Sequence, residues 1–204
     1  MRVAGIPLAN SNQSLSDYLL ELRFDEDPIV DSAARHTLSY PAGVTVSNGK
    51  GLFDGNSTSY ITVNDNQSDF DWSGNFHVVG TFTPTDLTSY RTLWDTRDDS
   101  GSYNSTQQLA IFTNPDGSLN VYTAGATVAS TTAGVMQVGV STEVGFFRNG
   151  TRCYFVVNGI LISDFVLSTL FNNPSRKMYV GGSQYSTAQF KGSIDAFKVL
   201  KFSA

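Results

Sequence analysis

The chain has 204 residues and is acidic, with 13 Lys and Arg against 18 Asp and Glu and a net charge of −5. Its basic residues are scattered, so it lacks the positive footprint that binding to nucleic acid or to an anionic membrane requires. Hydrophobic residues make up 40% of the sequence, enough for one sizeable core. No apolar stretch approaches the ~20 residues needed to span a bilayer.

The N-terminal segment, residues 1–17, has no sustained hydrophobic period and is polar after Leu8. It also lacks the apolar stretch of about 7–15 residues that marks a secretory signal. We expect an arm that contacts a partner chain, or that packs on its own domain, followed by one domain over residues 18–204. Cys153 is the only cysteine, so an internal disulfide cannot form, and its strand-like surroundings predict a small buried side chain.

From Tyr18 onward the sequence predicts short strands. Leu20, Leu22 and Phe24 alternate with polar neighbours, which is typical of a half-buried strand. In a later strand we expect His77 to be a surface or cross-strand residue. The strands predicted in the first half of the chain cover residues 19–24, 38–40, 44–46, 51–53, 60–63, 76–82 and 92–95.

The second half of the chain predicts a meander of three strands at residues 144–148, 151–157 and 160–166. Its connections are Asn149-Gly150 and Asn158-Gly159, the dipeptide that two-residue hairpin turns prefer. Other strands are predicted at residues 109–113, 118–123, 177–181 and 190–202. Turn residues about every 8–12 positions between short alternating runs indicate an all-β fold, an antiparallel β-sandwich.

The order of these segments resembles the laminin G-like, concanavalin A-like jelly roll, as found on bacteriophage virion proteins. The stretches that carry the resemblance are Leu52–Gly55, Asp69–Phe76, Asp116–Tyr122, Tyr154–Gly159 and Phe190–Val199. The resemblance implies a non-enzymatic virion structural protein, either a capsid decoration or a tail fibre subunit. The arm would then anchor it to other virion proteins, in a homo-oligomer or a symmetric assembly. The alternative is a carbohydrate-binding module that attaches the particle to host or mucus glycans.

The absence of a signal and of disulfides fits assembly in a host cytoplasm and display on the virion surface. Catalysis is not predicted. Jelly-roll glycoside hydrolases use a Glu-X-Asp-X-X-Glu strand that places two carboxylates close together, and the three glutamates here, at 21, 26 and 143, do not form it. Two His and one Cys also give no zinc cluster.

Calcium is the one metal that the resemblance suggests, because related jelly rolls clip early loops to an aspartate of the final strand. Asp195 matches that position, and Asp25 and Asp27 could lie close to it. Calcium prefers several oxygen ligands of this type. The alternative is that Asp195 caps backbone amides.

Glycan recognition needs aromatic side chains beside amide and hydroxyl groups in an accessible loop. The long polar loop over residues 96–106 and the loop over residues 182–189 offer both. The alternative is that these are ordinary solvated loops. The candidate glycan-binding residues are Asp98, Asp99, Tyr103, Asn104, Gln184 and Tyr185.

Overall fold

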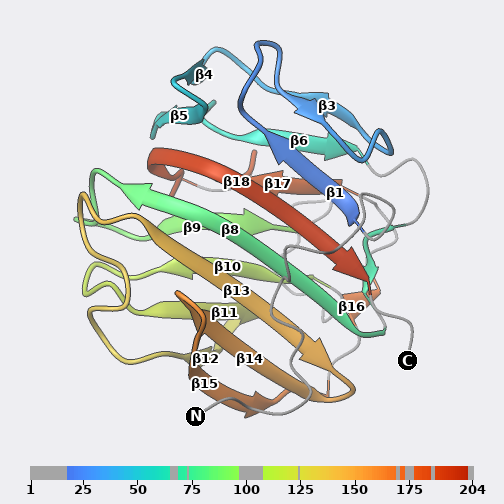
Figure 1. Cartoon of the computed structure of the whole chain (residues 1–204). Coiled ribbons are helices and arrows are strands. Elements are labelled where there is room, and N and C mark those ends of the chain that lie inside the picture. Colours follow the sequence, from blue (N-terminus) through green and yellow to red (C-terminus); the bar gives the residue numbers. More distant parts are fainter. Residues whose placement is uncertain are drawn as a thin grey trace.

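The computed structural model describes residues 18–64, 69–72, 74–96, 108–123, 125–168, 171–172, 177–184 and 187–201. These residues form two antiparallel sheets that lie one behind the other (Figure 1). The all-β sandwich that the sequence predicts is therefore confirmed. The predicted arm, residues 1–17, lies outside the described residues. Within the described part, there is no helix long and apolar enough to cross a membrane.

The first sheet has nine strands within the described residues and forms the front layer of Figure 1. In sheet order, its main path is β15 (Ile160–Val166), β14 (Arg152–Val157), β13 (Thr142–Asn149), β8 (Phe76–Pro84), β18 (Lys191–Lys201), β1 (Tyr18–Arg23) and β2 (Val30–Asp31). The remaining two strands are β5 (Lys50–Asp54), which pairs with β18, and β4 (Val44–Ser47), which pairs with β5.

The second sheet has seven strands within the described residues. In sheet order they are β12 (Ala126–Ser130), β11 (Leu119–Thr123), β10 (Ala110–Thr113), β9 (Arg91–Asp95), β17 (Lys177–Val180), β6 (Ile61–Asn64) and β3 (Thr37–Ser39). A separate pair consists of β7 (Asp71–Trp72) and β16 (Phe171–Asn172).

The core lies between the two sheets, because successive residues of a strand point to opposite faces. Leu20 and Leu22 of β1 are fully buried, as their alternation predicts. Across the sandwich, the Trp94 ring of the second sheet contacts the Phe146 ring of the first, with centroids 6.0 Å apart. Cys153 is also fully buried, as expected.

Two Asn-Gly turns form, one at Asn48-Gly49 and one at the predicted position Asn158-Gly159. Asn48 and Gly49 have φ of 52° and 72°, and Asn158 and Gly159 have 49° and 76°, the pair of positive values that a type I′ turn requires. The third is displaced by one residue: Asn149 pairs with Arg152, so the loop residues are Gly150 and Thr151. Gly150 alone takes the positive φ there, as in a type II′ turn.

Four strands of the described residues were not predicted: the two-residue strands β2, β7 and β16, and the longer β12. β12 has the sequence Ala-Thr-Val-Ala-Ser, most of it is exposed, and it pairs only with β11 among the described residues. Small and polar residues at a sheet edge give no alternation of buried and exposed positions, so the strand leaves no periodic signal.

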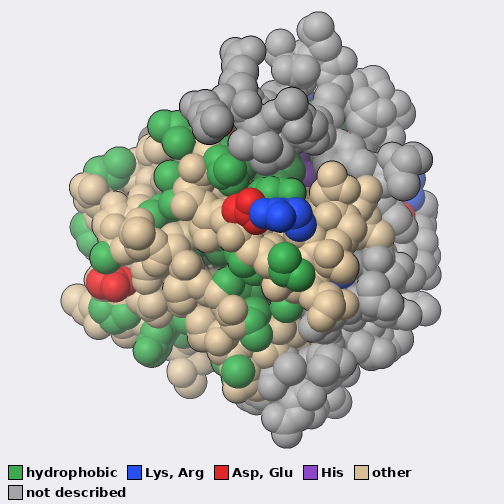
Figure 2. Space-filling model, turned by 90° about the horizontal axis from the view of Figure 1, so that it is seen from below, with side chains coloured by type: hydrophobic (Ala, Val, Ile, Leu, Met, Phe, Trp, Pro, Cys, Tyr) green, Lys and Arg blue, Asp and Glu red, His purple; other side chains and the backbone are tan. Residues whose placement is uncertain are grey.

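Figure 2, which views the molecule from below the orientation of Figure 1, shows hydrophobic and uncharged polar side chains with few charged ones.

Candidate functional site

A hollow of about 500 Å³ lies on the outer surface of the seven-stranded sheet, across β9, β10, β11 and β12. We call it the β9–β12 trough. Its volume is within the range of about 300–1,000 Å³ that is usual for small-molecule sites. The described residues that line it are Tyr90, Thr92, Ala110, Phe112, Asn114, Asn120, Tyr122, Thr127, Thr187 and Ala188.

Strand alternation builds the floor of the trough. Leu119 and Val121 of β11 point into the core and are fully buried, so the intervening Asn120 and the following Tyr122 face outward. On the neighbouring strand, Phe112 stands opposite both Asn120 of β11 and Thr92 of β9. The outer face of a regular hairpin thereby places a phenyl ring, an amide and a hydroxyl side by side.

Three aromatic rings form a connected row in the trough. The Phe112 ring contacts Tyr90, with centroids 5.6 Å apart and an interplanar angle of 82°. It also contacts Tyr122 at 6.1 Å and 61°. Edge-to-face packing of this kind is favourable and holds the rings at defined angles. Tyr90 is 55% exposed and so offers ring surface to a ligand.

Asn120 supplies an unsatisfied donor at the floor. Its side chain is only 2% exposed, and its Oδ1 accepts a hydrogen bond from the Ser130 hydroxyl. Its Nδ2 is buried and has no hydrogen-bond partner among the described residues. Burying such a group without a partner costs about 1–3 kcal/mol. A ligand oxygen placed in the trough would remove that penalty.

The rim of the trough comes from the segment before β18, which is fixed to β9. The Thr92 amide donates to the carbonyl oxygen of Ala188 at 2.7 Å. Gln189, which is 1% exposed, accepts from the Ser183 amide at 2.9 Å and donates to the Ser183 carbonyl oxygen at 2.7 Å. These bonds close the 183–189 loop and hold Thr187 and Ala188 at the rim.

The predicted glycan-binding residues mostly fall outside the part of the chain that the structure describes. These are Asp98, Asp99, Tyr103, Asn104 and Tyr185. Gln184 is described and exposed, and it belongs to the loop that carries Thr187 and Ala188, but it does not line the trough. Those assignments stay predictions.

The lining residues that the sequence reasoning missed include Phe112, Asn120 and Tyr122, which lie on β10 and β11, and Tyr90, which directly precedes β9. Their signal was available: two aromatic residues and one amide occupy the outward positions of a predicted hairpin.

The proposed calcium ligands do not form a cluster. Among the described residues, no three His, Cys, Asp or Glu side chains lie close enough to hold a metal ion. The Asp195 Oδ2 instead accepts a hydrogen bond from Lys50 at 3.1 Å. Asp27 lies 3.4 Å from the Tyr40 hydroxyl, and Asp25 flanks the turn at Gly49. Asp195 therefore makes an ion pair, and among the described residues it caps no backbone amide, which was the alternative. The calcium assignment stays a prediction.

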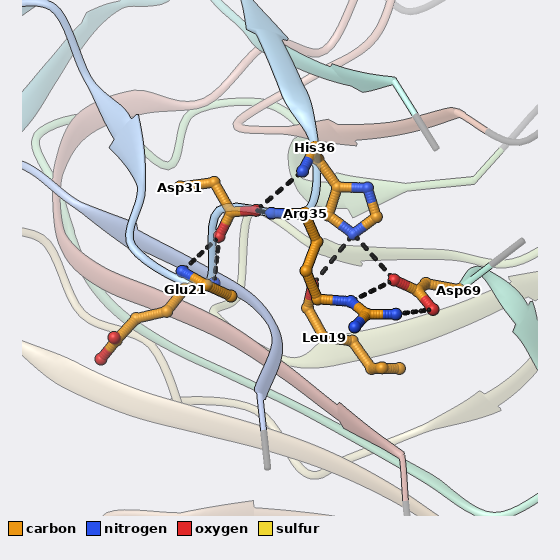
Figure 3. A network of polar contacts seen from close by, with 7 residues as sticks. Leu19, Glu21, Asp31, Arg35, His36 and Asp69 are labelled. Carbon is orange, nitrogen blue, oxygen red and sulfur yellow. Dashed lines mark hydrogen bonds and ion pairs between the residues drawn. The ribbon is translucent and has the colours of Figure 1, made fainter. Parts of the chain in front are cut away.

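A second polar cluster surrounds Asp69, near the start of β1 (Figure 3). Asp69 accepts two hydrogen bonds from Arg35, at 2.6 and 2.7 Å. The His36 Nε2 lies 3.4 Å from Asp69 and 2.9 Å from the carbonyl oxygen of Leu19. The His36 side chain is fully buried and stacks on Phe70. The cluster ties β1 to two loops, and its imidazole is closed to solvent, so we interpret it as structural.

Asp31 strengthens the same cluster from the other side. Its two carboxylate oxygens accept from the backbone amides of Glu21, Ala33, Arg35 and His36, each at 3.0 Å (Figure 3). A carboxylate with four such donors orders the turn that leads into β3.

Two further titratable side chains, those of Glu21 and Cys153, are buried. Burial alone would raise the pKa of Glu21, but hydrogen bonds from Lys198 and Arg23 outweigh it and lower the pKa. Burial raises the pKa of Cys153 to about 11, which leaves the thiol protonated at neutral pH. These environments do not favour a general acid or a nucleophile.

Comparison with known proteins identifies the fold. No family model matches the sequence, and no curated protein does. Solved structures match. The binding domain of Paraclostridial Mosquitocidal Protein 1 superposes with a TM-score of 0.72 and 18% identity, covering 94% of this chain and 50% of that one. The binding domain of botulinum neurotoxin serotype G gives 0.69 and 13%, covering 90% and 47%.

A third match is the CBM40 of the Ruminococcus gnavus IT-sialidase, solved bound to alpha2,3 sialyllactose. It has a TM-score of 0.54 and 13% identity, covering 62% of this chain and 75% of that one. The fold is therefore a concanavalin A-like jelly roll, as the sequence predicted. The chain spans about half the length of the first two of these matched binding domains. The finer resemblance to phage virion domains finds no match here and stays a prediction.

Proposed function

We propose that this chain is a lectin-like binding module that holds a carbohydrate in the β9–β12 trough. The observation that carries the proposal is the trough itself, where a row of three aromatic rings borders a buried amide whose Nδ2 has no partner in the described part of the chain. Sugar rings combine apolar C–H faces with hydroxyl groups that both donate and accept. Aromatic side chains and a few placed polar groups match that combination.

The similar structures support the same class of function. Several are named as binding domains of toxins, and the CBM40 was solved with a sialylated sugar. One neurotoxin binding domain was solved in complex with SialylT. None of these names assigns a ligand to this chain, so the trough geometry remains the main argument. The role as a virion component displayed on a particle stays a separate proposal from the sequence.

A glycan array followed by calorimetry tests the function. We expect the wild-type chain to bind at least one saccharide, and Phe112→Ala to weaken that binding by about tenfold or more, equivalent to ~1.4 kcal/mol. The control is Leu52→Ala, which truncates an exposed hydrophobic side chain on β5, in the other sheet. Binding that Phe112→Ala leaves intact would move the site away from the trough. The absence of any bound saccharide would reject the function.

A further inference from the structure

The lining of the β9–β12 trough carries no charge among the described residues. Its members are Tyr, Phe, Thr, Asn and Ala side chains only. A ligand with a carboxylate or a sulfate would lose its hydration there without gaining a cation. Burying an unpaired charge is far less favourable than burying a hydroxyl that finds a hydrogen bond.

Arg91 is the basic residue closest in sequence to the lining residues, but its side chain does not face the trough. Arg91 lies between Tyr90 and Thr92, which both line the trough, but strand alternation turns its side chain to the other side of β9. Its guanidinium is paired with Asp86 and donates to the carbonyl oxygen of Gln189 at 3.2 Å. The Arg91 side chain is only 10% exposed. Its charge is therefore already neutralised away from the ligand.

A negative group, Asp116, is linked to Asn114 at one end of the trough. Asn114 donates from Nδ2 to the Ser118 hydroxyl at 2.8 Å, and that hydroxyl donates to Asp116 at 2.7 Å. These two hydrogen bonds fix the Asn114 side chain at the edge of the trough. Its Oδ1 can then accept a hydrogen bond from a ligand hydroxyl. Asp116 would repel an anionic ligand, and the net charge of −5 acts in the same direction.

Resting on the proposed function, we propose that the trough selects uncharged saccharides and discriminates against sialylated, uronic or sulfated ones. Asn120 is the specificity-determining residue. Its buried Nδ2 donates to a sugar hydroxyl or ring oxygen, while Asn114 accepts from another hydroxyl, and the aromatic row contacts the apolar face of the sugar. A neutral hexose satisfies all three kinds of group. The proposed ligand class differs from the sialylated sugar with which the CBM40 match was solved.

Pairs of glycans that differ by one acidic group test this selectivity. Lactose and α2,3-sialyllactose form one pair, and a neutral hexose disaccharide and its sulfated form another. On an array and by calorimetry, we expect each bound neutral member to bind at least about tenfold more tightly than its acidic partner. Asn120→Asp, which replaces the donor by a carboxylate oxygen, should reduce neutral-glycan binding by more than about tenfold.

The control is Asn158→Asp, which adds the same charge in the β14–β15 turn and keeps the oxygen that accepts from the Glu143 amide. It should bind like the wild type. Tighter binding of acidic members that is lost in Phe112→Ala would overturn the selectivity but keep the carbohydrate-binding function. Full binding by Asn120→Asp would also overturn it. If neither member of any pair binds, the proposed function fails, and the selectivity fails with it.

Discussion

The His77 ring lies flat on the ring of Phe147, its cross-strand neighbour, with centroids 3.6 Å apart and planes 18° apart. Both residues face outward from the nine-stranded sheet, since Phe76, Val78 and Phe146 point into the core. His77 is nevertheless only 2% exposed. Burial lowers its pKa to about 3, so the imidazole is neutral at physiological pH.

This burial predicts that the protein loses stability as the pH falls below neutrality. The unfolded chain takes up a proton at His77 near the ordinary pKa of about 6.5, whereas the folded chain resists protonation down to about 3. The free energy of unfolding should therefore fall by up to about 1.4 kcal/mol per pH unit across that window. Urea denaturation at pH 7 and pH 5 measures the difference, which we expect to be roughly 2 kcal/mol from this residue.

His77→Phe is the matching control, because it keeps an aromatic ring on Phe147 and removes the titrating group. Between pH 7 and pH 5 its stability should change much less than that of the wild type. Equal pH dependence in both proteins would show that His77 is not the group responsible.

We expect a substitution in the Asp69 cluster to lower the stability of the fold and to leave saccharide binding unchanged. Asp69→Asn removes the carboxylate that receives Arg35 and faces the buried His36. Arg35 is partly exposed, so we expect the free energy of unfolding to drop by about 1–3 kcal/mol, less than for a fully buried pair. Asp164→Asn removes an exposed pair with Arg152 and should change it by less than about 1 kcal/mol. Similar losses in the two variants would contradict this assignment.

The sequence predicted the sandwich because alternation and turn chemistry are local signals. The alternation of Leu20 and Leu22 with polar neighbours was enough to place them in the core. The Asn158-Gly159 dipeptide was enough to place a hairpin turn. His77 shows where that reasoning ends: its strand position was correct, but its burial depends on neighbours far away in the chain. Asn149 shows the same limit for register. Moving the turn by one residue shifts the strand pairing by two, which leaves each side chain on the same face and so gives no signal in the hydrophobic pattern.

The trough was not predicted, since it depends on distant segments meeting. Tyr90, Phe112 and Tyr122 lie up to 32 positions apart and come together only through the pairing of β9, β10 and β11. Thr187 and Ala188 join them because the loop before β18 bonds to β9. The sequence reasoning chose the right loop for part of the rim. It looked for aromatic residues in loops, whereas Phe112 and Tyr122 lie on strands β10 and β11 and Tyr90 directly precedes β9.

The loop that forms the rim predicts an indirect effect on binding. A Cβ on Gly182 would lie 1.6 Å from the Gln189 Oε1, so Gly182→Ala must displace the side chain that closes the loop. We expect a loss of stability of roughly 1–3 kcal/mol and weaker saccharide binding, because Thr187 and Ala188 would shift. Gly74→Ala is the control, since a Cβ there meets nothing within 4 Å. Unchanged binding by Gly182→Ala would show that the rim does not contribute.

At Tyr90, we expect a substitution to weaken saccharide binding with little effect on the stability of the fold. Because this side chain is 55% exposed, Tyr90→Ala should alter the free energy of unfolding by less than about 0.5 kcal/mol. It should weaken saccharide binding by about tenfold, because it removes the most exposed ring of the trough. Tyr90→Phe keeps the ring and should retain most of the affinity, which calorimetry against the best neutral glycan would measure. If Tyr90→Phe loses as much as Tyr90→Ala, then the hydroxyl and not the ring is the recognition group.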